Sequence, residues 1–144
     1  MRVEEVASLS RILSIHTDSR TESLCVARKR IREAILGVGA AREVASEVEV
    51  AVGEALSNVH QHAYNDAAGY VEIQLDQTGP NMIVTVSDVG QATIAPVVPE
   101  TLPAPTPTGG RGLYLMSRLV DDVTINVNAT GHGLVVHLTR RVLA

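Results

Sequence analysis

The sequence predicts an α+β fold, a two-layer sandwich in which a mostly antiparallel sheet carries helices on one face. Three observations lead to this prediction. One short apolar segment near the start is followed by two segments whose apolar residues recur at helical spacing. Two pairs of strand-like segments come later, and a glycine-containing turn joins each pair. Strands joined by tight turns pair antiparallel, which leaves the helices to cover one face.

Size and composition fit a single domain over residues 1–144. With 45% hydrophobic residues, the chain can bury a core without disulfides or structural metals. Twelve Lys and Arg against 16 Asp and Glu give a net charge of −4, and Phe and Trp are absent, so neither nucleic acid nor an anionic membrane is an expected partner. The single cysteine, Cys25, and the lack of an export signal or long apolar run predict a cytoplasmic protein.

The first elements are a strand over 9–15 and a helix that ends near Gly37. Asp18-Ser19 follows the strand and is a typical helix N-cap. The helix is expected from apolar residues at helical spacing, namely Leu24, Ala27, Ile31, Ala34 and Ile35.

The longest predicted helix runs from Arg42 to Tyr64. Its apolar residues form one stripe, made of Val48, Val52, Ala55, Leu56, Val59 and Ala63. A hairpin follows, because residues 71–75 and 82–86 alternate between apolar and polar on either side of a Gly-Pro-Asn turn.

Residues 90–109 hold five of the six prolines, lack Lys and Arg, and show little periodicity, so they predict a loop that covers something. A short helix over 113–120 comes next. A final hairpin, with strands over 123–127 and 134–138, turns around Gly131 and Gly133.

The long helix also has a polar face. Glu54, Asn58, Gln61 and His62 lie within about 100° of one another, on the side away from the apolar stripe. Taken alone, this pattern is more typical of a solvated helix face than of a binding site.

Two further segments carry polar or glycine-rich chemistry. Asp88 ends an apolar strand, and Gly90 then lets the backbone turn away from the carboxylate. Thr108 to Leu113 is a glycine turn that runs into a helix, where free N–H groups favour an anion such as phosphate. An ordinary strand-terminal aspartate and a flexible helix start are the alternatives for these two segments.

In chain order, three segments resemble the motifs of the GHKL (Bergerat-fold) ATPase superfamily. Residues 54–64, Glu-Ala-Leu-Ser-Asn-Val-His-Gln-His-Ala-Tyr, resemble its N box, Asp88-Val89-Gly90 its first glycine box, and residues 110–116 its second. The E-A-x-S-N-x-x-x-H-A-Y form, the short length and Leu-Val-Asp-Asp-Val at 119–123 are similar to the anti-sigma-factor serine/threonine kinase branch. The resemblance implies the histidine-kinase-like ATPase fold.

The resemblance also implies a site for ATP and Mg²⁺. Asn58 is implied as the Mg²⁺ ligand, Glu54 as the general base near the γ-phosphate, and Asp88 as the acceptor for the adenine amino group. The segment after Gly90 is implied to be the lid. The other implied nucleotide contacts are His62, Gly90, Thr108, Gly109, Gly110, Arg111, Gly112 and Leu113.

In that branch, the kinase binds a sigma factor and phosphorylates a serine on an anti-anti-sigma (STAS-type) protein. A homodimer is also expected by resemblance. Arg28, Arg30 and Arg32 form a basic stripe that fits either a partner-facing surface or a solvated helix face. The alternative function is a partner-switching regulator of the same fold with weak or no kinase activity.

The sequence departs from the family pattern in three places. Gln91-Ala92 follows Gly90 where the family usually has a second glycine, which bears on how the lid hinges. Leu134 stands where members often have a threonine near adenine. The lid has no cation before Arg111, which bears on nucleotide affinity and phosphoryl transfer.

Overall fold

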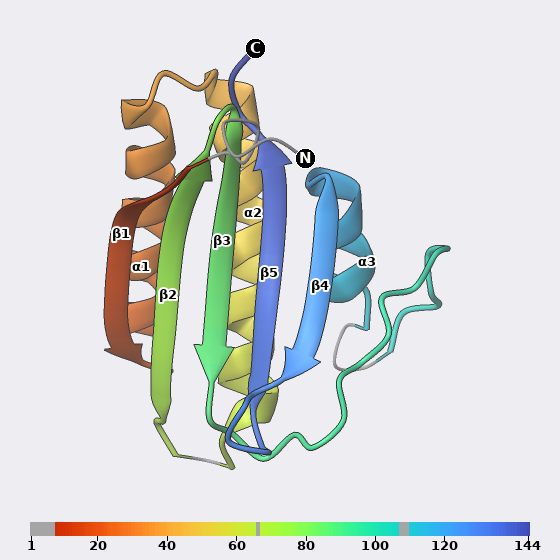
Figure 1. Cartoon of the computed structure of the whole chain (residues 1–144). Helices are drawn as coiled ribbons and strands as arrows, with labels where there is room; N and C mark the ends of the chain where they lie inside the picture. Colours follow the sequence, from red (N-terminus) through yellow and green to blue (C-terminus); the bar gives the residue numbers. More distant parts are fainter. Residues whose placement is uncertain (1–7, 66, 107–109) are drawn as a thin grey trace.

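The computed structural model describes residues 8–65, 67–106 and 110–144. Its helices and strands follow the predicted order (Figure 1). They are β1 (Leu9–Asp18), α1 (Thr21–Gly37), α2 (Arg42–Asn58), the π-helical turn η2 (Val59–Ala63), β2 (Tyr70–Thr78), β3 (Asn81–Asp88), α3 (Gly112–Leu119), β4 (Asp122–Val127) and β5 (Leu134–Arg141).

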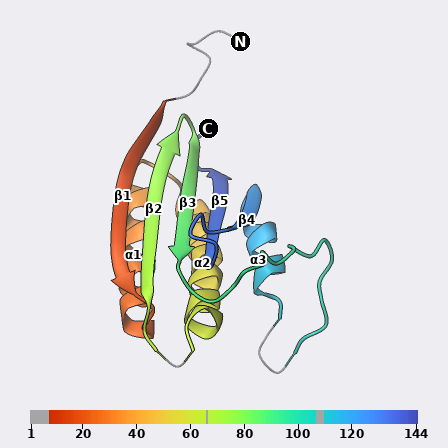
Figure 2. The same ribbon diagram turned by 60° about the horizontal axis from the view of Figure 1, so that its bottom comes forward.

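One five-stranded sheet forms the first layer, in the order β1-β2-β3-β5-β4. Each neighbouring pair of strands is antiparallel. The helices α1, α2 and α3 lie on one face of this sheet and form the second layer (Figures 1 and 2). The predicted fold class, a two-layer α+β sandwich with an antiparallel sheet, is confirmed.

The core lies between the central strands and α2. Every second residue is buried from Val71 to Leu75 in β2 and throughout β3, among them Ile73, Val84 and Val86. The buried face of α2 is made mostly of Ala and Val, which allows the helix to lie close to the sheet. Figure 1 shows α2 running behind the middle strands.

A charged bridge joins α1 to α2. Arg28 and Arg32 lie one turn apart on α1, and their Nε atoms are 3.6 and 3.5 Å from the two carboxylate oxygens of Glu49 on α2. Gly53 leaves room for the Arg28 stem, because a Cβ there would lie 3.3 Å from Arg28 Cδ. Of the three arginines in the basic stripe, Arg28 and Arg32 are thus paired with Glu49 within the molecule.

The start of α1 differs from the prediction. Arg20 occupies the N-cap position, and no side chain makes a capping hydrogen bond. The Asp18 carboxylate instead accepts the Arg20 backbone N–H at 2.9 Å, and this bond is the main cause that holds the pKa of Asp18 below its ordinary value. Ser19 is buried, and its Oγ accepts the Gly69 N–H at 3.0 Å. These two side chains therefore fix the turn after β1 rather than cap the helix.

The long helix predicted over 42–64 is interrupted before its end. The α-helix stops at Asn58, η2 continues as a π-helical turn, and Tyr64 is extended, with φ −129° and ψ 124°. The Tyr64 hydroxyl donates to the Tyr70 carbonyl at 2.5 Å and accepts the Val89 N–H at 2.9 Å. The chain leaves the helix at the point where this side chain joins the start of β2 to the end of β3.

The described part of the segment between β3 and α3 contains neither a helix nor a strand, as predicted for 90–109. Figure 2 shows it running outside the two layers, on the side of α3 and β4. Within residues 8–65, 67–106 and 110–144, no helix has the length and apolar character that crossing a bilayer requires.

Candidate functional site

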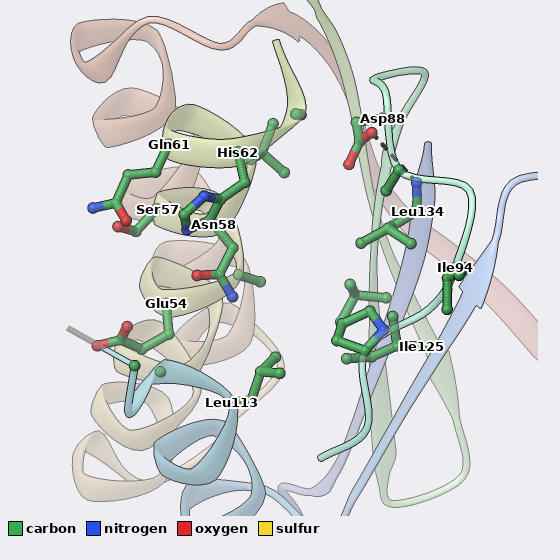
Figure 3. A pocket seen from close by; sticks show the side chains of 18 residues that line it. Glu54, Ser57, Asn58, Gln61, His62, Asp88, Ile94, Leu113, Ile125 and Leu134 are labelled. Carbon is green, nitrogen blue, oxygen red and sulfur yellow. Dashed lines mark hydrogen bonds between the residues drawn. The ribbon is translucent and has the colours of Figure 1, made fainter. Parts of the chain in front are cut away.

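A cavity of about 570 Å³ lies between α2 and η2 on one side and the strands β3, β5 and β4 on the other. The start of the long segment after β3 and the first turn of α3 complete its walls. Figure 3 shows the α2 and η2 side chains on one side of the cavity and Asp88, Leu134 and Ile125 on the other. Its lining includes the polar side chains Glu54, Ser57, Asn58, Gln61, His62 and Asp88 and the apolar side chains Ala55, Val59, Ala63, Ala92, Ile94, Pro96, Leu113, Ile125, Leu134 and Val136.

The polar face predicted for the long helix faces this cavity. Glu54 and Asn58 lie one turn apart on α2, and His62 follows on η2. Glu54 lies against the start of α3, where a Cβ on Gly112 would be 2.8 Å from its Oε2 atom and 3.7 Å from Asn58 Oδ1. The glycine thus lets the α3 backbone lie close to the Glu54 carboxylate, and a larger residue here would require Glu54 to shift.

Asp88 is fixed on the opposite wall. Its residue is 5% exposed, and its Oδ1 atom accepts the backbone N–H groups of Gly90 at 2.8 Å and Leu134 at 3.3 Å. Both bonds end on Oδ1, so Oδ2 is the oxygen that a ligand in the cavity would meet. The Asp88 carbonyl accepts the side-chain amide of Asn128 at 2.9 Å. The carboxylate therefore cannot swing away from the cavity without breaking backbone hydrogen bonds.

Gly90 supports the site from behind and is not among the residues that line the cavity. A Cβ on Gly90 would lie 2.3 Å from the Ala63 carbonyl oxygen, so the backbones of η2 and the segment after β3 touch at this point. His132 Nδ1 contacts the carbonyl oxygens of Val89 and Gly90 at 3.0 and 2.9 Å. The turn between β4 and β5 thus holds the glycine segment from its other side.

Part of the second glycine segment lines the cavity. Gly110, Gly112 and Leu113 line the cavity. Arg111 does not, because its side-chain Nε donates to the Pro103 carbonyl at 2.9 Å. Thr108 and Gly109, which were predicted as nucleotide contacts, lie outside the described residues.

Three residues that hold the site were not found by sequence reasoning. They are Tyr64, Asn128 and His132, and each acts through a bond to the backbone of residues 88–90. Burial is the main cause that raises the pKa of the Tyr64 hydroxyl, with a smaller contribution from the nearby Asp88 charge. These contacts join residues far apart in sequence, and no spacing pattern signals them.

The charges around the cavity are unbalanced. Its described lining contains the carboxylates of Glu54 and Asp88 and no Lys or Arg. The cavity therefore suits a ligand with a neutral hydrogen-bonding group near Asp88, and an anionic ligand would need a cation to enter beside Glu54.

Comparison with known proteins identifies the family. The model of the histidine kinase-like ATPase domain matches residues 17–140. This chain belongs to the histidine kinase-like ATPase family. Such a domain implies ATP as the ligand, and a cavity of about 570 Å³ with an apolar wall and one fixed carboxylate fits an adenine nucleotide.

Among curated proteins, this histidine kinase-like ATPase domain is similar to the serine-protein kinase RsbW of Bacillus velezensis, with 33% identity over 65% of this chain and 62% of the relative. RsbW of Bacillus subtilis is 32% identical over the same shares of the two chains. The chain thus spans less than two thirds of the length of these relatives.

Solved structures agree on the fold. The RsbU and RsbW domains of Rv1364c from Mycobacterium tuberculosis match 90% of this chain and 32% of that chain, with a TM-score of 0.66 and 21% identity. The histidine kinase domain of a blue-light activated histidine kinase from Erythrobacter litoralis matches 83% of this chain and 61% of that chain, with a TM-score of 0.52 and 27% identity. The histidine-kinase-like ATPase fold predicted from the sequence is confirmed.

Proposed function

We propose that this chain is an ATP-dependent serine/threonine protein kinase that also acts as an anti-sigma factor. The observation that carries the proposal is that Glu54 and Asn58 line one wall of a cavity whose opposite wall holds the fixed carboxylate of Asp88 (Figure 3). Relatives named serine-protein kinase support a hydroxyl acceptor. The proposal includes a single nucleotide-binding unit over 1–144 and a cytoplasmic location.

In this proposal, Asp88 selects adenine. Its Oδ2 atom accepts a hydrogen bond from the exocyclic amino group, and guanine offers a carbonyl at that position instead. The backbone bonds to Oδ1 support this role because they hold the acceptor in place before the base arrives. Leu134 presents an apolar side chain beside it, so the base is bounded there by packing.

Asn58 is the proposed Mg²⁺ ligand. The absence of Lys and Arg from the described lining supports a metal requirement, since a triphosphate beside the Glu54 carboxylate would otherwise be repelled. A bound Mg²⁺ supplies the positive charge that offsets the phosphates. The N-terminal turn of α3, where Gly112 and Leu113 line the cavity, adds backbone N–H groups.

Glu54 is the proposed general base. It accepts the proton of the acceptor serine hydroxyl while that oxygen bonds to the γ-phosphorus, and the bond from the γ-phosphorus to the β,γ-bridging oxygen breaks to release ADP. Its position against Gly112, one turn from Asn58, supports a role near the γ-phosphate end of the cavity.

The remaining predicted contacts divide by their position. His62, Gly110, Gly112 and Leu113 line the cavity and are proposed to touch the nucleotide directly. Gly90 contributes through the backbone it allows to pack. Thr108, Gly109 and Arg111 remain predictions from the resemblance.

The proposed partners are a sigma factor and a STAS-type anti-anti-sigma protein whose serine is phosphorylated, and the chain is proposed to form a homodimer. The exposed Arg30 is the charge of the basic stripe that is left for a partner, since Arg28 and Arg32 face Glu49. An acidic partner surface would suit it.

Calorimetric titration with ATP, with and without Mg²⁺, tests the site. Wild type should bind only with Mg²⁺, Asn58→Ala should lose at least tenfold in affinity, and the exposed Asn126→Ala on β4 should bind as wild type. Glu54→Gln should bind ATP normally and transfer phosphate to the antagonist serine at least 100-fold more slowly, whereas Glu43→Gln should not change the rate. A Glu54→Gln variant that transfers at the wild-type rate would remove Glu54 from the mechanism.

One observation favours the second candidate, a partner-switching regulator without transfer. Arg111, the cation nearest the cavity in the motif, is held by the Pro103 carbonyl. If the protein binds Mg²⁺ and ATP and its partners but leaves the antagonist serine unmodified, this second function replaces the first.

A further inference from the structure

Gln91 makes an unusual set of contacts at the point where the lid begins. Its backbone N–H donates to the Ala63 carbonyl at 3.0 Å. Its side-chain Nε2 donates to the His62 carbonyl at 3.1 Å and to Asn65 Oδ1 at 3.2 Å, and its Oε1 accepts from Asn65 Nδ2 at 3.1 Å. All four bonds end within residues 62–65, at the end of η2. The side chains of Gln91 and Asn65 form a reciprocal amide pair.

The residues on either side of Gln91 are already held. Gly90 packs against Ala63, and the carbonyl of Ala92 accepts the Gly133 N–H at 2.8 Å. Gln91 thus completes a short strip of backbone that is fixed to η2 on one side and to the β4–β5 turn on the other. Beyond Ala92 the described lid residues form neither helix nor strand.

The strip bears directly on the cavity. Ala92 lines the cavity from the lid side and His62 lines it from the helix side, and the Gln91 amide bonds to the His62 carbonyl. His62 lies in the last turn of η2, and the carbonyls at a helix end are open to side-chain donors such as the Gln91 amide. The Gln91 side chain therefore links the two walls at one end of the cavity.

We propose that Gln91 is a positioning residue for nucleotide binding, which ties the first residues of the lid to η2 and so pre-forms the part of the cavity beside Asp88. The inference rests on the proposed nucleotide site. Because this wall is already formed, the first lid residues need not be ordered when the nucleotide binds, and this lowers the entropic cost of binding. Gln91 touches neither reacting atoms nor Glu54, so it acts on affinity and not on the transfer step.

Amide hydrogen exchange in the nucleotide-free protein tests the tie directly. In Gln91→Ala, the amides of residue 91 and Gly133 should exchange about three- to tenfold faster, because each loses the support of the tied strip. Amides of β2 should not change. Gln77→Ala is the matched control, since Gln77 is also a surface glutamine whose Nε2 donates to a backbone carbonyl, that of Gly79 at 3.2 Å. Unchanged exchange at both amides would overturn the proposal.

The pairing with Asn65 gives a second arm. Asn65→Ala should reproduce the faster exchange in part, and the double variant with Gln91→Ala should be no faster than Gln91→Ala alone, because both changes remove one shared interaction. Gln91→Glu keeps the acceptor for Asn65 but places a carboxylate against the His62 carbonyl, so it should exchange at least as fast as Gln91→Ala. Additive effects of the two alanine changes would contradict a shared tie.

Nucleotide measurements complete the test. Gln91→Ala should raise the Kd for ATP with Mg²⁺ about three- to tenfold and leave the transfer rate at saturating ATP within twofold of wild type. A fall in that rate with unchanged affinity would overturn the positioning role. If wild type binds no ATP, the proposed nucleotide site fails, whereas the exchange experiments still decide whether Gln91 holds the lid.

Discussion

Two glycines in the β4–β5 turn allow the fixation of Asp88 to be tested by a matched pair. Gly131 and Gly133 have similar positive φ angles, +95° and +87°, so an alanine strains the backbone at either position by about 1–2 kcal/mol. Their surroundings differ. A Cβ at 131 meets nothing within 4 Å, whereas a Cβ at 133 would lie 2.2 Å from the Asp88 carbonyl oxygen and 2.7 Å from Val89 Cα. Both of these are backbone atoms, so the end of β3 must move.

Forcing extra atoms into a packed site costs about 1–3 kcal/mol beyond the φ strain. Gly131→Ala should therefore lower the free energy of unfolding by about 1–2 kcal/mol, and Gly133→Ala by about 2–5 kcal/mol. For a chain of 144 residues, 1 kcal/mol corresponds to a melting-temperature change of roughly 3–4 °C. The two variants should differ by roughly 3–12 °C.

Thermal unfolding followed by circular dichroism measures this difference, and calorimetry with ATP and Mg²⁺ measures its effect on the site. Because Gly133→Ala displaces Asp88, it should also weaken ATP binding at least tenfold, whereas Gly131→Ala should bind within twofold of wild type. Equal melting temperatures and equal affinities for the two variants would refute the reasoning that the β4–β5 turn holds Asp88.

Three further predictions concern the other contacts of the site. Tyr64→Phe loses both backbone bonds of the hydroxyl and should lower the free energy of unfolding, measured by urea titration, by about 1–2 kcal/mol. Tyr114→Phe is the control and should change this free energy little, because the described residues show no hydrogen bond to the Tyr114 side chain. Burial raises the pKa of Tyr64, so its contribution is complete below about pH 10 and is lost as the pH rises through the raised pKa; alkaline unfolding curves of Tyr64→Phe should lack this part of the decline. Gly112→Ala places a Cβ 2.8 Å from the flexible end of Glu54. The melting temperature should therefore stay unchanged, while the rate of phosphate transfer should fall about 10- to 100-fold. An unchanged transfer rate would mean that the close approach of α3 to Glu54 does not affect the reaction.

Much of the fold follows from patterns within single segments. The alternation of β2 and β3 and the apolar stripe of α2 were read correctly because each reflects one buried face. The convergence of Glu54, Asn58 and Asp88 on one cavity was expected through the resemblance to a known family, not from periodicity.

Other features depend on contacts that no local pattern records. The apolar residues Val59 and Ala63 fit an α-helix and a π-helical turn equally well, so their spacing does not show that the α-helix ends at Asn58. Asp18 has the chemistry of a helix cap, but its competing bond to the Arg20 backbone wins in the folded chain. Arg111 was expected to face phosphate, and its bond to Pro103 depends on the course of a loop that has no periodicity.

The cavity draws its lining from only part of the domain, and this has an evolutionary implication. Among the described residues, those that line the cavity come from α2, η2, β3, the lid, α3, β4 and β5, and none comes from β1, α1 or β2. Substitutions on the outward surfaces of β1, α1 and β2 can therefore accumulate without changing the residues that line the cavity. The exposed face of α1 is thus a place where the surface of the domain can change while the lining of the cavity stays the same.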